Sequence, residues 1–193
     1  MIIGLTGSIA TGKSTLSKYL KDLGYLVINT DDIAHQVLTF PHIIKKIESL
    51  VNKDVVESGI INRKKLGDIV FNDSEKLRIL NNITHPEIYR ITKDLIEKQS
   101  GVVFVEVPLL FETNFTSLVD KIIVISADEK IQIKRLKKRN KITTNEAINL
   151  INKQMSLNEK ARLADYVIDN SSTIKHMERQ VLNLLEKENL RWK

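Results

Sequence analysis

A glycine-bearing segment near the start of the chain has residue types that suit phosphate binding. Residues 7–14 read Gly-Ser-Ile-Ala-Thr-Gly-Lys-Ser and match every fixed position of the pattern G-x-x-x-x-G-K-[ST]. Gly7 and Gly12 allow the backbone to approach phosphate oxygens closely, with consecutive amide groups pointing at them. Lys13 is expected to reach the β- and γ-phosphates, and Ser14 is expected to bind Mg²⁺. A glycine-bearing turn can match this pattern by chance, so its setting in the chain matters.

The flanking segments supply the setting that a phosphate loop requires. An apolar run precedes the loop, and a helical pattern over residues 13–23 follows it and ends at Gly24. Mostly β-branched, nearly continuous apolar runs are typical of parallel strands buried on both faces. Such runs occupy residues 2–6, 25–29, 102–107, 121–126 and 166–169. With helical patterns between them, also at 128–139 and 172–188, they predict a P-loop NTPase fold: three α/β/α layers around a five-stranded parallel sheet.

Two intervals are too long for simple crossovers between strands. Residues 32–100 predict a helical substrate lobe, and the polar, basic residues 135–162 predict a helical lid. We therefore expect a single domain whose core comprises residues 1–31, 101–134 and 163–193. Within the lobe, the pattern predicts helices at 33–37, 43–51, 63–71, 73–83 and 86–99.

Composition narrows the classes of protein and of partner. The 193 residues include no cysteine, which excludes disulfides and thiolate metal sites, and no apolar run approaches the roughly 20 residues that span a bilayer. The formal charge of +6 suits nucleic acid, an acidic membrane surface or polyanionic small molecules. Only 5% of residues are aromatic, which argues against a base-stacking surface. We expect a cytoplasmic protein.

Other classes of P-loop protein fit less well. A switch GTPase needs N-K-x-D after a strand, and the Asn-Lys pairs at 52–53 and 152–153 both lack the final Asp. A motor or helicase ATPase usually has a strand ending in Asp, whereas the third strand here ends Val105-Glu106-Val107-Pro108. These absences favour a small-molecule kinase with an acceptor lobe and a mobile basic lid. A kinase of nucleosides or nucleotides and a non-catalytic ATP-dependent switch remain alternatives.

Several longer segments resemble the dephospho-CoA kinase family, in the family's order and over most of the chain. They are residues 3–7, 27–34, His85-Pro86, Val107-Pro108-Leu109-Leu110-Phe111-Glu112 and residues 164–170 (Ala-Asp-Tyr-Val-Ile-Asp-Asn). The resemblance implies that ATP phosphorylates the ribose 3′-hydroxyl of dephospho-CoA, giving coenzyme A and ADP. It also implies ATP and Mg²⁺ as cofactors, dephospho-CoA as the small-molecule substrate, no nucleic-acid or membrane partner, and a monomer or weak homo-oligomer.

Three residues are the candidates for catalysis: Lys13, Asp31 and Arg139. Asp31 follows the second strand, where ligands bind in open α/β sheets, and a carboxylate there can take the proton of the acceptor hydroxyl. The alternative is that Asp31 caps the following helix, the role we favour for Asp32. Arg139 lies one helical turn after Arg135, and its guanidinium suits phosphate oxygens; the alternative is a solvated basic face.

Binding residues follow from the loop and from the resemblance. The nucleotide is expected to contact Gly7, Ile9, Ala10, Thr11, Gly12, Lys13, Ser14, Thr15 and Asn170. The acceptor is expected to contact Asp31, His85, Pro108, Leu109, Leu110 and Glu112. For His85 the alternative is a structural role at the start of a helix, and for Glu112 the alternative is a helix cap. Leu109 and Leu110 line either the acceptor pocket or the hydrophobic core. Glu106 either holds a metal-bound water or pairs with a neighbouring base. The chain departs from the family at Ser8 and Ala10, where glycine is common, and at Asn29, where an acid is common.

Overall fold

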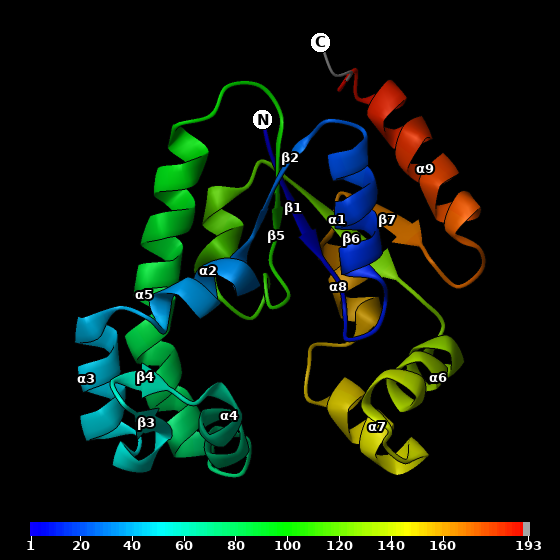
Figure 1. The fold of residues 1–193 in the computed structure, drawn as a ribbon. Coiled ribbons are helices and arrows are strands. Elements are labelled where there is room, and N and C mark those ends of the chain that lie inside the picture. The colour runs from blue at the N-terminus through cyan, green and yellow to red at the C-terminus, as the bar shows by residue number, and fades with distance from the viewer. Residues whose placement is uncertain (191–193) are drawn as a thin grey trace. The chain divides into compact units, whose positions relative to one another are not determined.

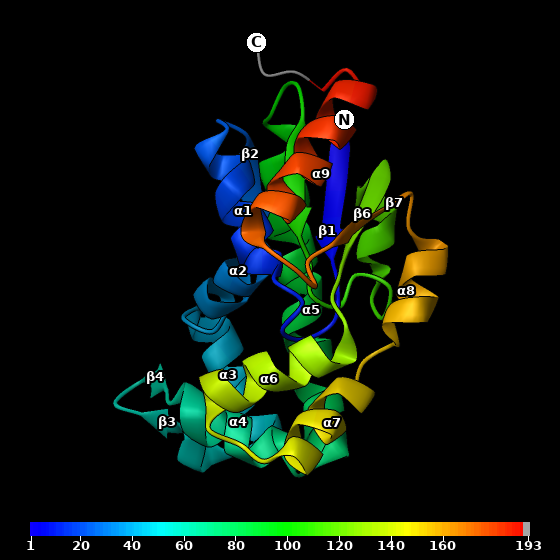
Figure 2. The same cartoon turned by 90° about the vertical axis from the view of Figure 1, so that its right-hand side faces the viewer.

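The computed structural model describes residues 1–190, which form two compact units (Figures 1 and 2). One unit comprises Met1–Asn29 together with the chain from Gln99 onward, and the other comprises Thr30–Lys98. The phosphate loop and the predicted lid belong to the first unit, and the predicted substrate lobe forms most of the second.

A five-stranded parallel sheet forms the centre of the first unit. Its order is β2-β5-β1-β6-β7, so β1 lies in the middle and the phosphate loop leaves the sheet from its central strand. The predicted fold class is confirmed. The strands are β1 (Ile2–Thr6), β2 (Leu26–Asn29), β5 (Val103–Glu106), β6 (Lys121–Ser126) and β7 (Tyr166–Asp169).

Helices cover both faces of this sheet. Leu16 and Leu20 of α1 and Met177 of α9 are buried in one core with Phe104 of β5 and Ile125 of β6. Figures 1 and 2 place α8 on the opposite face from α1 and α9, which gives the three layers. The helices of this unit are α1 (Lys13–Asp22), α6 (Glu129–Asn140), α7 (Thr144–Asn152), α8 (Leu157–Leu163), α9 (Ile174–Lys187) and the short 3₁₀ helix η2 (Asn114–Leu118).

The second unit is mainly helical. The long helix α5 packs against α2, α3 and α4, and these helices bury Ile43, Ile47, Leu66, Val70 and Ile88. Its elements are α2 (Thr30–Val37), α3 (Pro41–Leu50), η1 (Lys53–Val55), β3 (Val56–Glu57), β4 (Ile60–Ile61), α4 (Arg63–Phe71) and α5 (Ser74–Glu97).

The prediction of two helices at 73–83 and 86–99 was wrong. Helix α5 runs through both segments with Pro86 inside it. Its buried stripe of Thr84, Ile88 and Thr92 continues across the proline, and the Thr84 hydroxyl donates to the Leu80 carbonyl at 2.9 Å. Packing of this stripe outweighs the hydrogen bond that proline cannot donate. The β3–β4 hairpin was not predicted either, because strands of two residues carry no periodicity.

Within the described residues 1–190, the helices include none with the length and apolar character that a membrane span requires.

Candidate active site

The phosphate loop, residues 7–14, joins β1 to α1 and has the backbone that its glycines permit. Gly7 has φ +153° and Gly12 has φ +108°. A Cβ on Gly7 would lie 2.4 Å from the Ile125 carbonyl oxygen, and one on Gly12 would lie 2.1 Å from Asn170 Nδ2. Both positions therefore exclude any side chain, for conformational and for steric reasons.

The two departures from the family's glycine content differ in their structural effect. Ala10 adopts φ +62°, a left-handed conformation that glycine adopts without a steric penalty and alanine does not. Ser8 is buried, and its hydroxyl donates to Gln154 Oε1 at 3.2 Å. The loop thus accepts strain at one of these positions and gains a tertiary contact at the other.

Lys13 and Ser14 occupy the first turn of α1. Lys13 Nζ donates to the carbonyl oxygens of Gly7 and Ser8, at 2.9 and 3.0 Å, so the ammonium lies over the loop. Ser14 is exposed. The first turn of α1 carries no acidic residue, which leaves the positive end of the helix dipole available to an anion.

Arg135 and Asn170 donate hydrogen bonds to carbonyl oxygens of the loop. Arg135 Nη1 donates to the carbonyls of Ala10 and Thr11, at 3.3 and 3.1 Å, and Nη2 donates to the Asn170 carbonyl at 2.8 Å. The buried Asn170 side chain donates to the Thr11 carbonyl at 2.7 Å. Sequence reasoning missed this role of Arg135, although its spacing of four residues from Arg139 was a signal that both face one direction.

Arg139, the predicted phosphate contact, is exposed at the end of α6. Its Nε donates to the neighbouring Asn140 Oδ1 at 2.8 Å. The structure places Arg135 against the loop and Arg139 one turn further along the same helix. The role of Arg139 in phosphate binding stays a prediction.

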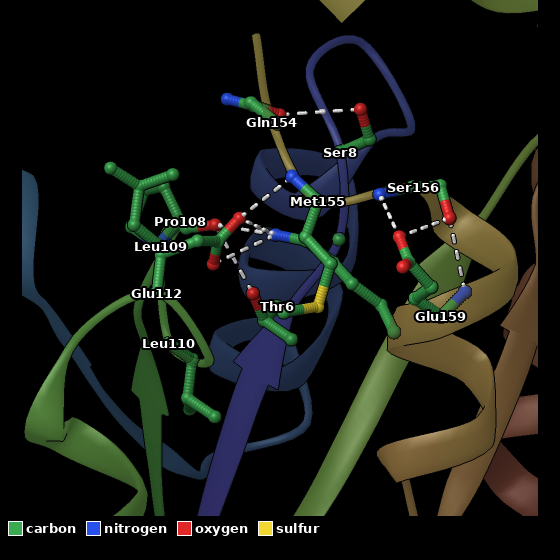
Figure 3. Close-up of polar contacts among 12 residues, drawn as sticks. Thr6, Ser8, Pro108, Leu109, Leu110, Glu112, Gln154, Met155, Ser156 and Glu159 are labelled. Atoms are coloured by element: carbon green, nitrogen blue, oxygen red, sulfur yellow. Dashed lines mark hydrogen bonds and ion pairs between the residues drawn. The ribbon is translucent and has the colours of Figure 1, made fainter. Parts of the chain in front are cut away.

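A group of polar side chains links the loop to the segment after β5 and to the start of α8 (Figure 3). Gln154 Oε1 accepts from the Ile9 amide at 2.8 Å, and Glu112 Oε1 accepts from the Met155 amide at 3.2 Å. Glu112 also pairs with the fully buried Lys160 at 2.9 Å. The predicted acceptor contact of Glu112 stays a prediction, and the internal pair is the contact that sequence reasoning missed.

Pro108, Leu109 and Leu110 differ in what they present. The Pro108 carbonyl accepts from Thr6 Oγ1 at 3.2 Å, so this segment is bonded to the end of β1. Leu110 is fully buried, and its Cδ1 lies 2.6 Å from the point where a Cβ on Gly4 would stand. Leu109 is 38% exposed. Leu110 thus contributes to the core, and Leu109 is the one available to a ligand.

Glu106 is buried at the end of β5, and its contacts include a hydroxyl and an amide. Its Oε2 accepts from Ser17 Oγ at 2.6 Å and from Asn29 Nδ2 at 3.3 Å. Asn29 replaces an acid common in the family, and its amide donates where a second carboxylate would repel Glu106. The two sequence interpretations of Glu106, a contact with a metal-bound water or a pair with a neighbouring base, both stay predictions.

The candidate acceptor residues Asp31 and His85 belong to the second unit. Helix α2 begins at Thr30, so Asp31 and Asp32 both lie within its first turn, and both are exposed. Neither is the residue preceding the helix, which argues against the capping role that we favoured for Asp32. His85 lies on α5, half-buried, and its burial lowers the pKa of the imidazole.

Comparisons with known proteins show which family this chain resembles. The family model described as dephospho-CoA kinase matches residues 1–176. A dephospho-CoA kinase of Carboxydothermus hydrogenoformans is 46% identical over 198 residues, covering 100% of this chain and 95% of that protein. A dephospho-CoA kinase of Listeria innocua is 42% identical over 191 residues, covering 96% of each.

Solved structures match this chain over nearly its whole length. A crystal structure of a Thermus thermophilus protein matches with a TM-score of 0.83 at 28% identity, covering 97% of each chain. Dephospho-CoA kinase from Campylobacter jejuni matches with a TM-score of 0.70 at 32% identity, covering 97% of this chain and 98% of that one. Shikimate kinase of Aquifex aeolicus, at 18% identity and a TM-score of 0.56, shares the fold. Because the family model spans most of the sequence and these relatives cover nearly all of it, the chain belongs to the dephospho-CoA kinase family.

Proposed function

We propose that this protein transfers the γ-phosphate of ATP to the ribose 3′-hydroxyl of dephospho-CoA, giving coenzyme A and ADP. The observation that carries the proposal is the phosphate loop at the end of the central strand, in a chain that matches this family over nearly its whole length. The loop accounts for the nucleotide donor, and family membership supports the choice of acceptor.

The donor half of the proposed mechanism rests on the loop and on cations. Loop amides and the α1 dipole hold the phosphates, and Lys13 swings from the Gly7 and Ser8 carbonyls to the β- and γ-oxygens. Arg139, on the last turn of α6, then stabilises charge on the transferring group. Transfer is direct and in line, with no phosphoenzyme.

In the acceptor half, Asp31 is the proposed general base. Its carboxylate accepts the proton of the ribose hydroxyl as the new O–P bond forms. The rest of dephospho-CoA is proposed to bind to His85, to Leu109 and to the residues beside Leu109. Closure of the lid is proposed to exclude water and so to limit hydrolysis of ATP.

The residues present fit a magnesium ion held mainly by the nucleotide. Ser14 is exposed on the first turn of α1, beside Lys13, where its hydroxyl can serve as a ligand together with phosphate oxygens. Residues 1–190 contain no group of three or more acidic or histidine side chains that would form an all-protein metal cage. Bound Mg²⁺ would neutralise charge on the β- and γ-phosphates.

A coupled assay of ADP release tests the acceptor. We expect turnover with ATP, Mg²⁺ and dephospho-CoA, with a product that carries one additional phosphate at the 3′ position. Coenzyme A, whose 3′ position is already phosphorylated, should give no turnover. Equal rates with a nucleoside or a nucleoside monophosphate would support the alternative, a nucleoside or nucleotide kinase. ATP binding without phosphorylation of any of these acceptors would support a non-catalytic switch.

We also propose a cytoplasmic location and a monomeric or weakly oligomeric state. The absence of cysteine from the sequence is compatible with a reducing compartment. Sedimentation of the purified protein over a range of concentrations tests the oligomeric state directly.

A further inference from the structure

The segment between α7 and α8 is bonded to the phosphate loop through the side chain of Gln154. Its Oε1 accepts from the Ile9 amide at 2.8 Å and from Ser8 Oγ at 3.2 Å. Both donors follow Gly7, a position with a permissive backbone. A single side-chain oxygen from a residue 145 positions away thus contacts two consecutive residues of the loop. Figure 3 shows its contact with Ser8.

The next residue, Met155, is held by Glu112. The Met155 amide donates to Glu112 Oε1 at 3.2 Å, which fixes the backbone immediately after Gln154. Glu112 lies in the segment after β5, so this contact joins the predicted lid to a segment that follows a strand of the central sheet (Figure 3). The position of Gln154 thus depends on a carboxylate that lies outside the lid.

Lys160 holds that carboxylate in place. Its side chain on α8 is completely buried, and Nζ lies 2.9 Å from Glu112 Oε1 and 3.2 Å from Oε2. The Pro108 carbonyl is a further acceptor at 3.4 Å and also accepts from Thr6 Oγ1 of β1. A buried ammonium needs a paired carboxylate, so Glu112 is confined to this position.

We propose that the Glu112–Lys160 ion pair and Gln154 act together as positioning residues for the phosphate loop. The pair fixes Met155, Met155 places Gln154, and Gln154 holds Ser8 and Ile9 in the arrangement that receives ATP. This inference rests on the proposed function only in taking residues 7–14 as the ATP site.

The expected kinetic signature is a change in ATP binding rather than in chemistry. A loop that is ordered before ATP arrives pays less conformational entropy on binding. The same loop contacts are present in the ground state and in the transition state, so losing the order should raise the KM for ATP and leave kcat nearly unchanged.

Gln154→Ala tests the inference with little risk to the fold, because this side chain is only half-buried. We expect the KM for ATP to rise about 10-fold with kcat within about twofold of the parent. Amide hydrogen exchange should become faster in the peptide that contains Ile9. Asn149→Ala, an exposed change on α7, is the matched control and should alter neither measurement.

Glu112→Gln tests the ion pair and separates it from a direct role in the acceptor site. The positioning role predicts a higher KM for ATP and faster exchange at Met155, with an unchanged KM for dephospho-CoA. A selective rise in the KM for dephospho-CoA would overturn it in favour of a substrate contact. If Glu112→Gln fails to fold, the Gln154 variants still decide the matter.

The double variant that combines Gln154→Ala with Glu112→Gln tests whether these two residues act in one network. Once Gln154 is alanine, Glu112→Gln should add little further increase in the KM for ATP, because residues in one network are not additive. Fully additive effects, or an unchanged KM in Gln154→Ala, would overturn the proposal. Calorimetric titration with ATP alone gives the same comparison without any acceptor, so an error in the acceptor assignment would leave this result interpretable.

Discussion

At the scale of single residues, the phosphate loop makes the most stringent demand for a particular residue type. Gly12→Ala places a Cβ 2.1 Å from Asn170 Nδ2 at a φ of +108°, so the loop must shift or lose the Asn170 contact. We expect ATP affinity to fall by about 100-fold or more, since about 3 kcal/mol of clash and strain corresponds to that factor. Isothermal titration with ATP measures it.

Gly67→Ala is the matched control for that substitution. Gly67 lies inside α4 and has open space where a Cβ would stand. Alanine is the better helix former, so the variant should gain about 0.5–1 kcal/mol in free energy of unfolding and keep the parent's ATP affinity. Equal ATP affinity in the two alanine variants would show that the steric argument at Gly12 is mistaken.

Asp31 is the residue on which the chemical step is predicted to depend. Asp31→Asn keeps the shape of the side chain and removes its capacity to accept a proton, so kcat should fall by about 10²-fold or more. ATP should still bind, because the phosphate loop is unchanged. Steady-state kinetics and an ATP titration measure the two effects separately.

Asp32→Asn is the comparison for Asp31→Asn, since both carboxylates are exposed in the first turn of α2. Each loses a similar favourable interaction with the helix dipole, so their stabilities should change alike. Only Asp31→Asn should lose turnover. Near-parental turnover in Asp31→Asn would reduce that residue to a contributor to helix stability.

At the scale of elements, the sequence correctly predicted those strands whose position depends on the local pattern of apolar residues. The β-branched runs gave β6 and β7 with the observed bounds, and β1 likewise, because a buried parallel strand must be apolar throughout. Pro86 led to the wrong prediction of two separate helices, because the packing that keeps α5 continuous is a tertiary property. The contacts of Arg135 and Gln154 with the loop join residues more than 120 positions apart, so local pattern cannot reveal them.

Pro86 inside helix α5 is expected to lower the free energy of unfolding. Proline inside a helix removes one backbone hydrogen bond and crowds the preceding turn. Because Pro86 is exposed, Pro86→Ala should relieve this without opening a cavity and raise the free energy of unfolding by about 1–3 kcal/mol. Urea denaturation of the full chain gives the value.

Pro41→Ala is the control for Pro86→Ala. Pro41 stands at the first position of α3, where the proline amide would have no helical partner in any case. Its replacement should change the free energy of unfolding little or lower it slightly. A similar gain in both variants would contradict the argument that the cost of Pro86 comes from its place inside α5.

At the scale of the whole molecule, the sequence conveyed the class of fold and ligand better than the details of the site. The phosphate-loop motif, the alternation of strands and helices, and the two long intervals together predicted a P-loop kinase for a small molecule. The five-stranded parallel sheet confirms the fold, and the comparisons confirm the family. The acceptor residues of the second unit stay predictions, because their role depends on how they meet the donor site.

The formal charge of +6 predicts an effect on substrate capture that belongs to the whole protein and not to any single residue. ATP and dephospho-CoA are both anions, so the field of a cationic protein should raise their encounter rates and affinities. Raising KCl from about 20 to about 200 mM shortens the screening length from roughly 20 Å to below 10 Å, so both KM values should rise several-fold. The value of kcat should change less, because charges in contact within a closed site are screened less than charges at a distance. Sucrose at matched osmolality controls for changes in water activity. Salt-independent KM values for both substrates would mean that local contacts such as those of Lys13, and not the overall charge, determine capture.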